Sequence, residues 1–379
     1  MDKLQRKGKA FFLPFALFLF SSPMCSFASS GTEGAAFLDI PVGAGPAAVG
    51  SAYTALAKDA YTATWNPGGL GFLESTQFSG QHLAYLDTIH YEYLSFAVPL
   101  PRTSSCTSPD ECPGSALGGS IQYLGSGDVS GTDNFGAPTG SFSSHYASYN
   151  LAYGRAFNDQ LSLGLTGKMI NAKIDNVSAN AYAVDLGSMY KLTHHLTLAS
   201  TLTNLGSKLT FLNQGDPLPL AFHVGAVYQP THQWLLTTEG VYPRTGLASF
   251  HLGGEWRPLE LLSIRAGYRT DTVKELSPIA GFSAGLGVDV WGQELSYAWV
   301  PYGDLGDTHY VSLVMKFGEV QRAKRNLIQF QHIKTHRTAN ANGTEELTPD
   351  SQQLMELFEQ TKDRVAKQGN GAVQDHEQR

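Results

Sequence analysis

From about Thr76 to Phe317, apolar and polar residues alternate along a series of short segments. In the segment 161–166, leucine stands at every second position, and serine, glycine or threonine stands between the leucines. The segments 182–190 and 262–269 repeat this alternation with other apolar residues. A period of two residues is that of a β-strand with one apolar and one polar face, so the pattern predicts an all-β chain with about 14 strands.

The alternation also fits a soluble β-sandwich, but other features favour a transmembrane antiparallel β-barrel. The polar face contains mostly Gly, Ser and Thr with few charges, which is typical of a barrel lumen. Aromatic residues recur at one end of the strands, as in the girdle at a membrane interface. These residues are Tyr190, Tyr228, Trp256 and Phe317.

The connections between the predicted strands alternate in length. Tight links follow every second strand from the fourth to the twelfth, at 158–160, 193–195, 230–232, 258–260 and 291–292. Longer links follow the strands between them, at 125–145, 175–180, 207–219, 270–278 and 301–307. Short periplasmic turns and long outer loops are typical of outer-membrane barrels, so we expect an even strand number with both termini in the periplasm. The link 99–115 breaks this rule, because it is long on the short side.

The first 28 residues resemble a secretory signal peptide. A basic stretch precedes an apolar run at 10–20, and Ser26-Phe27-Ala28 offers a cleavage site with small residues. The run is shorter than the roughly 20 residues of a membrane-spanning helix, which disfavours the alternative of an anchor. Met24 precedes Cys25 where a lipoprotein would carry a small residue. We therefore expect export through the inner membrane.

Composition changes this interpretation little. The net charge is −7, with Lys and Arg scattered, which argues against a nucleic-acid partner. Charged residues make up only 16% of the chain, and it contains 40 glycines, 17 tyrosines and 20 phenylalanines. Low charge and many aromatics suit a sheet whose outer face contacts outer-membrane lipid.

Two cysteines, Cys106 and Cys112, flank the polar stretch 107–111. An oxidising periplasm favours a disulfide between them. Free thiols remain an alternative. A metal site is a weaker one, because no further Cys or His lies close by.

The regions on either side of the predicted barrel, 76–318, lack its alternation. The segment 29–75 is rich in small residues; Ala47 to Ala60 predicts a short helix, and Asn66-Pro67 predicts a helix start with Asn as the N-cap. The tail 319–379 is polar and charge-rich. We expect an amphipathic helix from Thr348-Pro349 and otherwise a disordered periplasmic tail.

The segment 42–70, which runs from VGAGPAAVGSAYTALAKDA to TWNPGGL, resembles the N-terminal signature of the PorV/PorQ family of outer-membrane proteins. That family is related to the FadL-type long-chain fatty-acid transporters. Gly45-Pro46 stands where the family often has Arg, and Gly68 stands where it has Ala. The matching positions are Gly43, Gly50, Ala52, Tyr53, Asp59, Trp65, Asn66, Pro67 and Leu70.

The resemblance implies a barrel of about 14 strands whose N-terminal segment, 29–75, folds into the lumen as a hatch; such a lumen is too wide for its own side chains to fill. A plain periplasmic extension is the alternative. We expect Asp59 and Asn66 to bond lumen groups such as Lys168, Arg265 or Lys316. Lumen-facing candidates, most of which we expect to pair with one another, are Lys168, Asp185, Glu239, Glu255, Arg265 and Lys316.

The chain has no P-loop, no Gly-x-Ser-x-Gly elbow and no His-Glu-x-x-His motif, so we expect neither an enzyme nor a bound cofactor or metal. The resemblance implies a component of protein export or surface attachment, with periplasmic or secretion-system proteins as partners. The alternatives are an uptake channel for hydrophobic small molecules such as long-chain fatty acids, and a structural barrel. An apolar pocket at the hatch would favour uptake; a closed polar lumen with large outer loops would favour protein partners.

Overall fold

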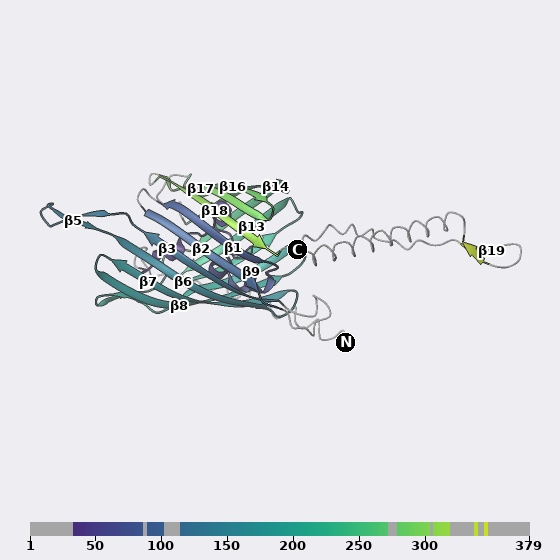
Figure 1. Cartoon of the computed structure of the whole chain (residues 1–379), viewed down its shortest axis with the longest axis horizontal. Helices are drawn as coiled ribbons and strands as arrows, with labels where there is room; N and C mark the ends of the chain where they lie inside the picture. The colour runs from purple at the N-terminus through teal and green to yellow at the C-terminus, as the bar shows by residue number, and fades with distance from the viewer. Residues whose placement is uncertain are drawn as a thin grey trace, which may run out of the picture. The chain divides into compact units, whose positions relative to one another are not determined.

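Fourteen antiparallel strands close into a barrel in the computed structural model, which describes residues 33–85, 89–101, 114–271, 279–303, 306–318, 337–339 and 345–347 (Figure 1). Each strand pairs with its neighbours along the chain, and β1 pairs with β18 to close the sheet. The predicted all-β fold and antiparallel barrel are confirmed. The barrel strands are β1 (Thr76–Tyr85), β2 (Ile89–Pro99), β3 (Ser115–Gly125), β6 (Ser144–Ala156), β7 (Leu161–Ile174), β8 (Val177–Lys191), β9 (Leu196–Gly206), β12 (Ala221–Tyr228), β13 (Trp234–Pro243), β14 (Ser249–Leu259), β15 (Leu262–Arg269), β16 (Phe282–Val290), β17 (Gln293–Pro301) and β18 (Asp307–Phe317).

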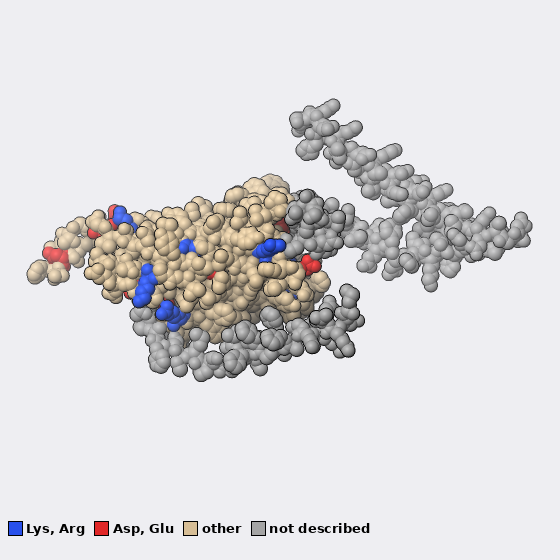
Figure 2. All heavy atoms as spheres, turned by 90° about the horizontal axis from the view of Figure 1, so that it is seen from below, with Lys and Arg blue, Asp and Glu red and all other residues tan. Residues whose placement is uncertain are grey.

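The two faces of each strand differ as the alternation predicts. On β2, Leu94 and Phe96 point outwards and are exposed, whereas Tyr91 and Tyr93 point inwards and are buried. Figure 2 shows an outer surface with few charged side chains. The rings of Trp234 and Trp256 stack 5.6 Å apart on this face, near the short links. No helix among the described residues is long and apolar enough to cross a membrane.

One predicted loop is wrong. We expected a long link at 175–180, but β7 continues to Ile174 and β8 begins at Val177, so Asp175 and Asn176 form a two-residue turn. The strands continue because the backbone ladder needs no apolar side chains, and the side chains of Asn171 and Asn180 bond across it at 2.7 Å. Other long links contain short hairpins: β4 (Val129–Thr132) with β5 (Pro138–Phe142), and β10 (Leu209–Phe211) with β11 (Gln214–Asp216).

Several predicted features lie outside the described residues. They are the signal peptide, the Cys106–Cys112 pair and the helix from Thr348. The tail forms a unit of its own. In it, β19 (Arg337–Ala339) and β20 (Glu345–Leu347) pair as an antiparallel hairpin.

The segment before β1 forms four short helical elements: η1 (Ala36–Asp39), α2 (Ala44–Ala48), α3 (Thr62–Trp65) and η2 (Pro67–Phe72). The predicted helix over 47–60 is wrong, because α2 ends at Ala48 and the chain turns through Gly50 and Ser51, whose φ angles are 67° and 61°. Asn66 is the N-cap that we predicted: its side chain accepts a 2.9 Å hydrogen bond from the Gly68 amide, although η2 is a 3-10 helix.

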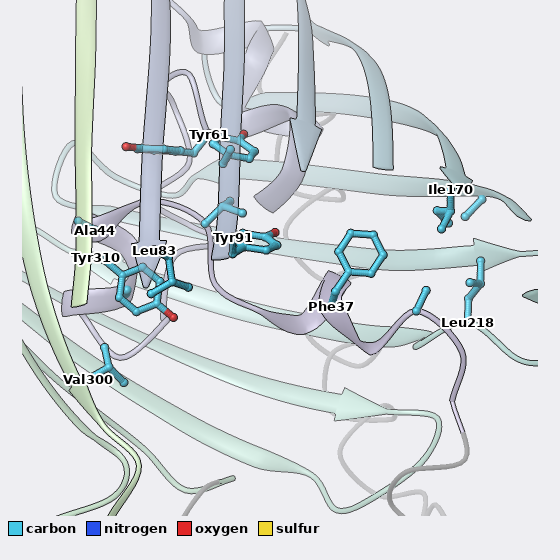
Figure 3. Close-up of a cluster of buried hydrophobic side chains, with 14 of the residues drawn as sticks. Phe37, Ala44, Tyr61, Leu83, Tyr91, Ile170, Leu218, Val300 and Tyr310 are labelled. Carbon is cyan, nitrogen blue, oxygen red and sulfur yellow. The ribbon is translucent and has the colours of Figure 1, made fainter. Parts of the chain in front are cut away.

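The buried core lies inside the barrel, between the N-terminal segment and the wall. Figure 3 shows Phe37, Ala44 and Tyr61 of this segment beside Tyr91 and Tyr310 of the strands. The N-terminal segment therefore occupies the lumen, and we call residues 33–75 the hatch.

Candidate functional site

The hatch follows the inner wall almost completely around. Helix α2 contacts β15 to β18, and η2 contacts β3, β6, β7 and β8 on the other side. Between these elements, Gly50 lies against β14 and β15, and Ala55 lies against β12. The hatch is therefore fastened to opposite sides of the barrel.

Inward-facing glycines form the surface on which the hatch lies. A Cβ atom at Gly164 would stand 2.2 Å from the Pro67 oxygen, and one at Gly267 would stand 2.0 Å from the Gly50 nitrogen. Both distances are far below van der Waals contact, so only glycine lets the hatch backbone approach so closely. This glycine track comprises Gly118, Gly154, Gly164, Gly187, Gly225, Gly253, Gly267 and Gly285.

Polar bonds fix the hatch at its middle and at its end. The buried carboxylate of Glu239 accepts 2.9 Å bonds from the amide and the hydroxyl of Thr54, and it bonds His223 at 2.8 Å. The buried amide of Asn66 donates to the carbonyls of Thr54 (2.9 Å) and Ser188 (3.1 Å). Because each of these groups lies away from water, losing one partner would leave the other unsatisfied.

The expected bonds from Asp59 and Asn66 to the lumen cations are not formed. Lys168 instead pairs with Asp185 at 2.7 Å and donates to Asn204 at 2.8 Å. Asp59 accepts from the Tyr53 hydroxyl and, at 3.0 Å, from the Tyr61 amide within the hatch. Buried charges pair with the nearest opposite charge, and for Lys168 that charge lies on the neighbouring strand.

A second network surrounds Arg265, which pairs with Glu255 on β14 at 2.6 Å and with Glu294 on β17 at 2.7 Å. The guanidinium reaches across β16 over Gly287, where an added Cβ would stand 2.9 Å from it. Lys316 lies near this network and, together with Arg265 and Glu294, lines a small cavity. The sequence analysis identified Arg265 and Glu255 but missed Glu294, which the alternation on 293–301 could have placed in the lumen.

The remaining motif residues hold the hatch together or seat it on the wall. The Gly43 amide donates to Gln81, the Ala52 carbonyl accepts from Thr237 at 2.7 Å, and Leu70 is buried. The sequence analysis missed the wall partners Gln81 and Thr237. Both lie on the inward face of the alternation, which is the signal that could have identified them.

Two cavities lie on opposite sides of the hatch. The larger, about 890 Å³, is lined by Ile40, Val42 and Trp65 of the hatch and by residues 245–248 of the link between β13 and β14. It therefore lies toward the end of the barrel with the longer links. A smaller cavity of about 200 Å³ lies toward the other end, beside Tyr53.

An aromatic cluster separates the cavities. The Tyr53 ring lies 5.7 Å from Trp65 and 6.4 Å from Tyr61, and Trp65 donates to the Val42 carbonyl at 2.9 Å. Tyr53 bonds Asp59, and burial raises the pKa of that carboxyl to about 6, an effect that the bonds from Tyr53 and Tyr61 partly offset. The cluster therefore separates the two cavities, and Asp59, the residue that holds Tyr53 in place, is titratable.

No family model and no curated protein matches the chain. Among solved structures, it is similar to the Pseudomonas putida toluene transporter TodX, with 12% identity, a TM-score of 0.45, and coverage of 67% of this chain and 92% of that one. A Pseudomonas aeruginosa FadL homologue gives 12% identity, a TM-score of 0.46, and coverage of 72% and 96%. The KdgM porin gives 10% identity, a TM-score of 0.33, and coverage of 64% and 99%.

Proposed function

We propose that this chain is an outer-membrane uptake channel for hydrophobic or amphipathic small molecules. The observation that carries the proposal is the cavity of about 890 Å³ above the hatch, which has the size of a small-molecule site. Its floor is apolar at Val42 and Trp65, whereas its side walls contain paired polar groups such as His223 with Glu239. Such a lining suits a molecule with an apolar body and a polar end.

The location follows from the outer face, which exposes a continuous apolar surface on the strands. Such a surface would be costly in water and is stable in a bilayer. With the longer links outside the cell, the cavity opens to the exterior and the hatch closes the route inwards. Passage then requires the partition of Tyr53, Tyr61 and Trp65 to move.

Filling the cavity tests the proposal. Ala248 lines the cavity and is exposed to it, so Ala248→Trp should reduce its volume. The matched control is Ala266→Trp, because Ala266 is exposed on the outer face of β15. We expect uptake of radiolabelled oleate or toluene, by cells that lack their own transporter, to fall for Ala248→Trp alone. Equal uptake by the two variants, at equal protein levels, would contradict the proposal.

A second candidate function, attachment or export of a partner protein, is favoured by the hairpin of β4 and β5. All residues of β5 are exposed, and Phe135 at the hairpin tip is 95% exposed (Figure 1). The exposed Phe135 ring at the end of this hairpin is accessible to a protein partner. A photo-crosslinking residue at Phe135 tests this role: reproducible crosslinks to one surface or secretion protein would support it, and crosslinks to none would exclude it.

A further inference from the structure

The outer face of the wall carries a hollow of about 910 Å³ that the uptake route does not use. It extends over β18, β1, β2, β3, β6, β7 and β8, and outward-facing apolar side chains surround it. They include Phe78, Leu94, Phe96, Ile121, Leu151 and Met169.

Small residues on both faces of the wall account for the hollow. Inside, the hydroxyls of Ser79 and Ser95 lie 2.6 Å apart, and Ser120 bonds Thr64 of the hatch at 3.0 Å, so this wall lies close to the hatch. Outside, Gly80 and Gly167 leave open space in the floor of the hollow, whereas the Phe96 ring packs over Gly119. A nearly dry, apolar hollow facing hydrocarbon is a place for acyl chains, because neither water nor a void is stable there.

Histidine side chains lie along one edge of the hollow, which we call its rim. His82 and Glu92 are the next outward positions beyond Gly80 and Leu94, toward the end with the longer links, and their side chains bond at 2.7 Å. His90 stacks on His82, with the ring centroids 6.1 Å apart.

The neighbouring strands extend this rim. His145 stacks on Tyr123 at 6.3 Å, beyond Ile121 of the hollow. His309 on β18 bonds the Tyr297 hydroxyl at 2.8 Å. We call His82, His90, His145 and His309 the histidine rim.

We propose that the hollow and the histidine rim form a binding site for a lipid with a phosphate headgroup. The acyl chains fill the hollow, and the phosphate oxygens accept hydrogen bonds from imidazole N–H groups, which are donors in either protonation state. The carboxylate of Glu92, which lies on this rim, is paired with His82. The site is separate from the lumen cavity, and the inference rests on the membrane location proposed above.

Filling the hollow tests the acyl-chain half of the site. An added Cβ at Gly80 meets only Leu94, at 3.5 Å, and one at Gly167 meets only a backbone oxygen at 4.0 Å, so Gly80→Leu with Gly167→Leu should fold. Gly254→Leu is the control: Gly254 lies on the outer face of β14, with its nearest neighbour at 3.6 Å. Native mass spectrometry of the full chain in detergent, with dioleoyl-phosphatidylglycerol added, counts the bound lipid. We expect binding to be lost only in the double variant; wild-type binding by that variant, with normal circular dichroism, overturns the site.

Replacing the imidazoles tests the phosphate half. His90→Phe, His145→Phe and His309→Phe together keep the rings and remove the N–H donors. Wild-type protein should bind dioleoyl-phosphatidylglycerol more tightly than dioleoylglycerol, which has the same chains and no phosphate; the triple variant should bind both equally. A preference that persists in the triple variant overturns the role of His90, His145 and His309 as donors to the phosphate. Lipid binding is measured on purified protein, so its failure is distinguishable from a failure of uptake.

Discussion

Gly253 and Gly254 are neighbours on β14, yet they face different surroundings. A Cβ atom at Gly253 would stand 2.3 Å from the Val49 oxygen of the hatch, whereas one at Gly254 would stand 3.6 Å from a single leucine methyl on the outer face. The inner face of the wall thus has a fixed partner in the hatch, whereas the outer face at Gly254 contacts no part of the hatch. This difference predicts that equal changes on the two faces have unequal effects.

The largest effect should follow from fixing the hatch to the inner face. An ideal Cβ at Gly225 lies 3.4 Å from the Ala55 Cβ, close to the separation in a disulfide. In a background without Cys106 and Cys112, we expect Ala55→Cys with Gly225→Cys to crosslink the hatch to β12. Oleate uptake should fall to the level of cells without the protein and return on reduction. Uptake that continues while the crosslink is intact would show that the hatch need not leave this wall.

A side chain that wedges the hatch away should act in the opposite sense. Gly267→Val places atoms where the Gly50 backbone lies, and we expect a loss of about 3 kcal/mol, at the upper end of overpacking costs. Entry of a small polar dye into cells should rise. Ala266→Val, one residue away on the outer face, is the control and should leave both the unfolding transition and dye entry unchanged. Equal effects of the two variants would remove the distinction between the faces.

Removing a buried amide should weaken docking less. Asn66→Ala leaves the Thr54 and Ser188 carbonyls and the Gly68 amide without their partner, which should cost about 2 kcal/mol. The control is Asn180→Ala on the exposed part of β8, where we expect less than about 0.5 kcal/mol. Denaturant unfolding of both variants in detergent gives the comparison.

The smallest effect should come from pH. Burial raises the pKa of Asp59 from 3.8 to about 6, so the docked hatch holds this proton more tightly than the released one. The resulting stabilisation is fully present below about pH 4 and is lost as the pH rises through about 6. Burial lowers the pKa of Lys58 to about 8, so the charge of this side chain changes only above this pH range. Proteolysis of the hatch should therefore be faster at about pH 7.5 than at about pH 5. Asp59→Asn should reduce this difference to the part that Asp39 contributes, because burial raises the pKa of that hatch carboxyl to about 7.

The strands could be predicted because their outer faces expose apolar side chains and their inner faces carry small or polar ones, which gives the period of two. Where the outward apolar side chains end, this signal ends too, so the sequence pattern does not predict the continuation of β7 and β8 beyond Ala172 and Ala179. The N-cap at Asn66 was predicted because it depends on local chemistry alone. The end of α2 at Ala48 was not, because Gly50 turns to fit the wall.

The pairing of charged residues within the lumen could not be predicted from the sequence, for a physical reason. Lys168 and Asp185 lie on neighbouring strands, and only the register of β7 and β8 shows that they are diagonal neighbours. Arg265 reaches Glu294 two strands away, which depends on the missing side chain at Gly287. In the sequence, the glycine track looks like any lumen face with small residues, because the hatch residues that require these glycines lie about 50 to 240 residues away along the chain.

Two adjacent hatch amides lie over the seam where the first and last barrel strands meet. The Gly43 amide donates to Gln81 on β1, and the Ala44 amide donates to Ser312 on β18 at 3.1 Å; Gln81 and Ser312 are themselves register partners. A slip of one residue between β1 and β18 would turn one of these side chains to the outside and break its bond. The two bonds can therefore form together only when β1 and β18 pair in this register, so complete docking of the hatch requires a correctly closed sheet.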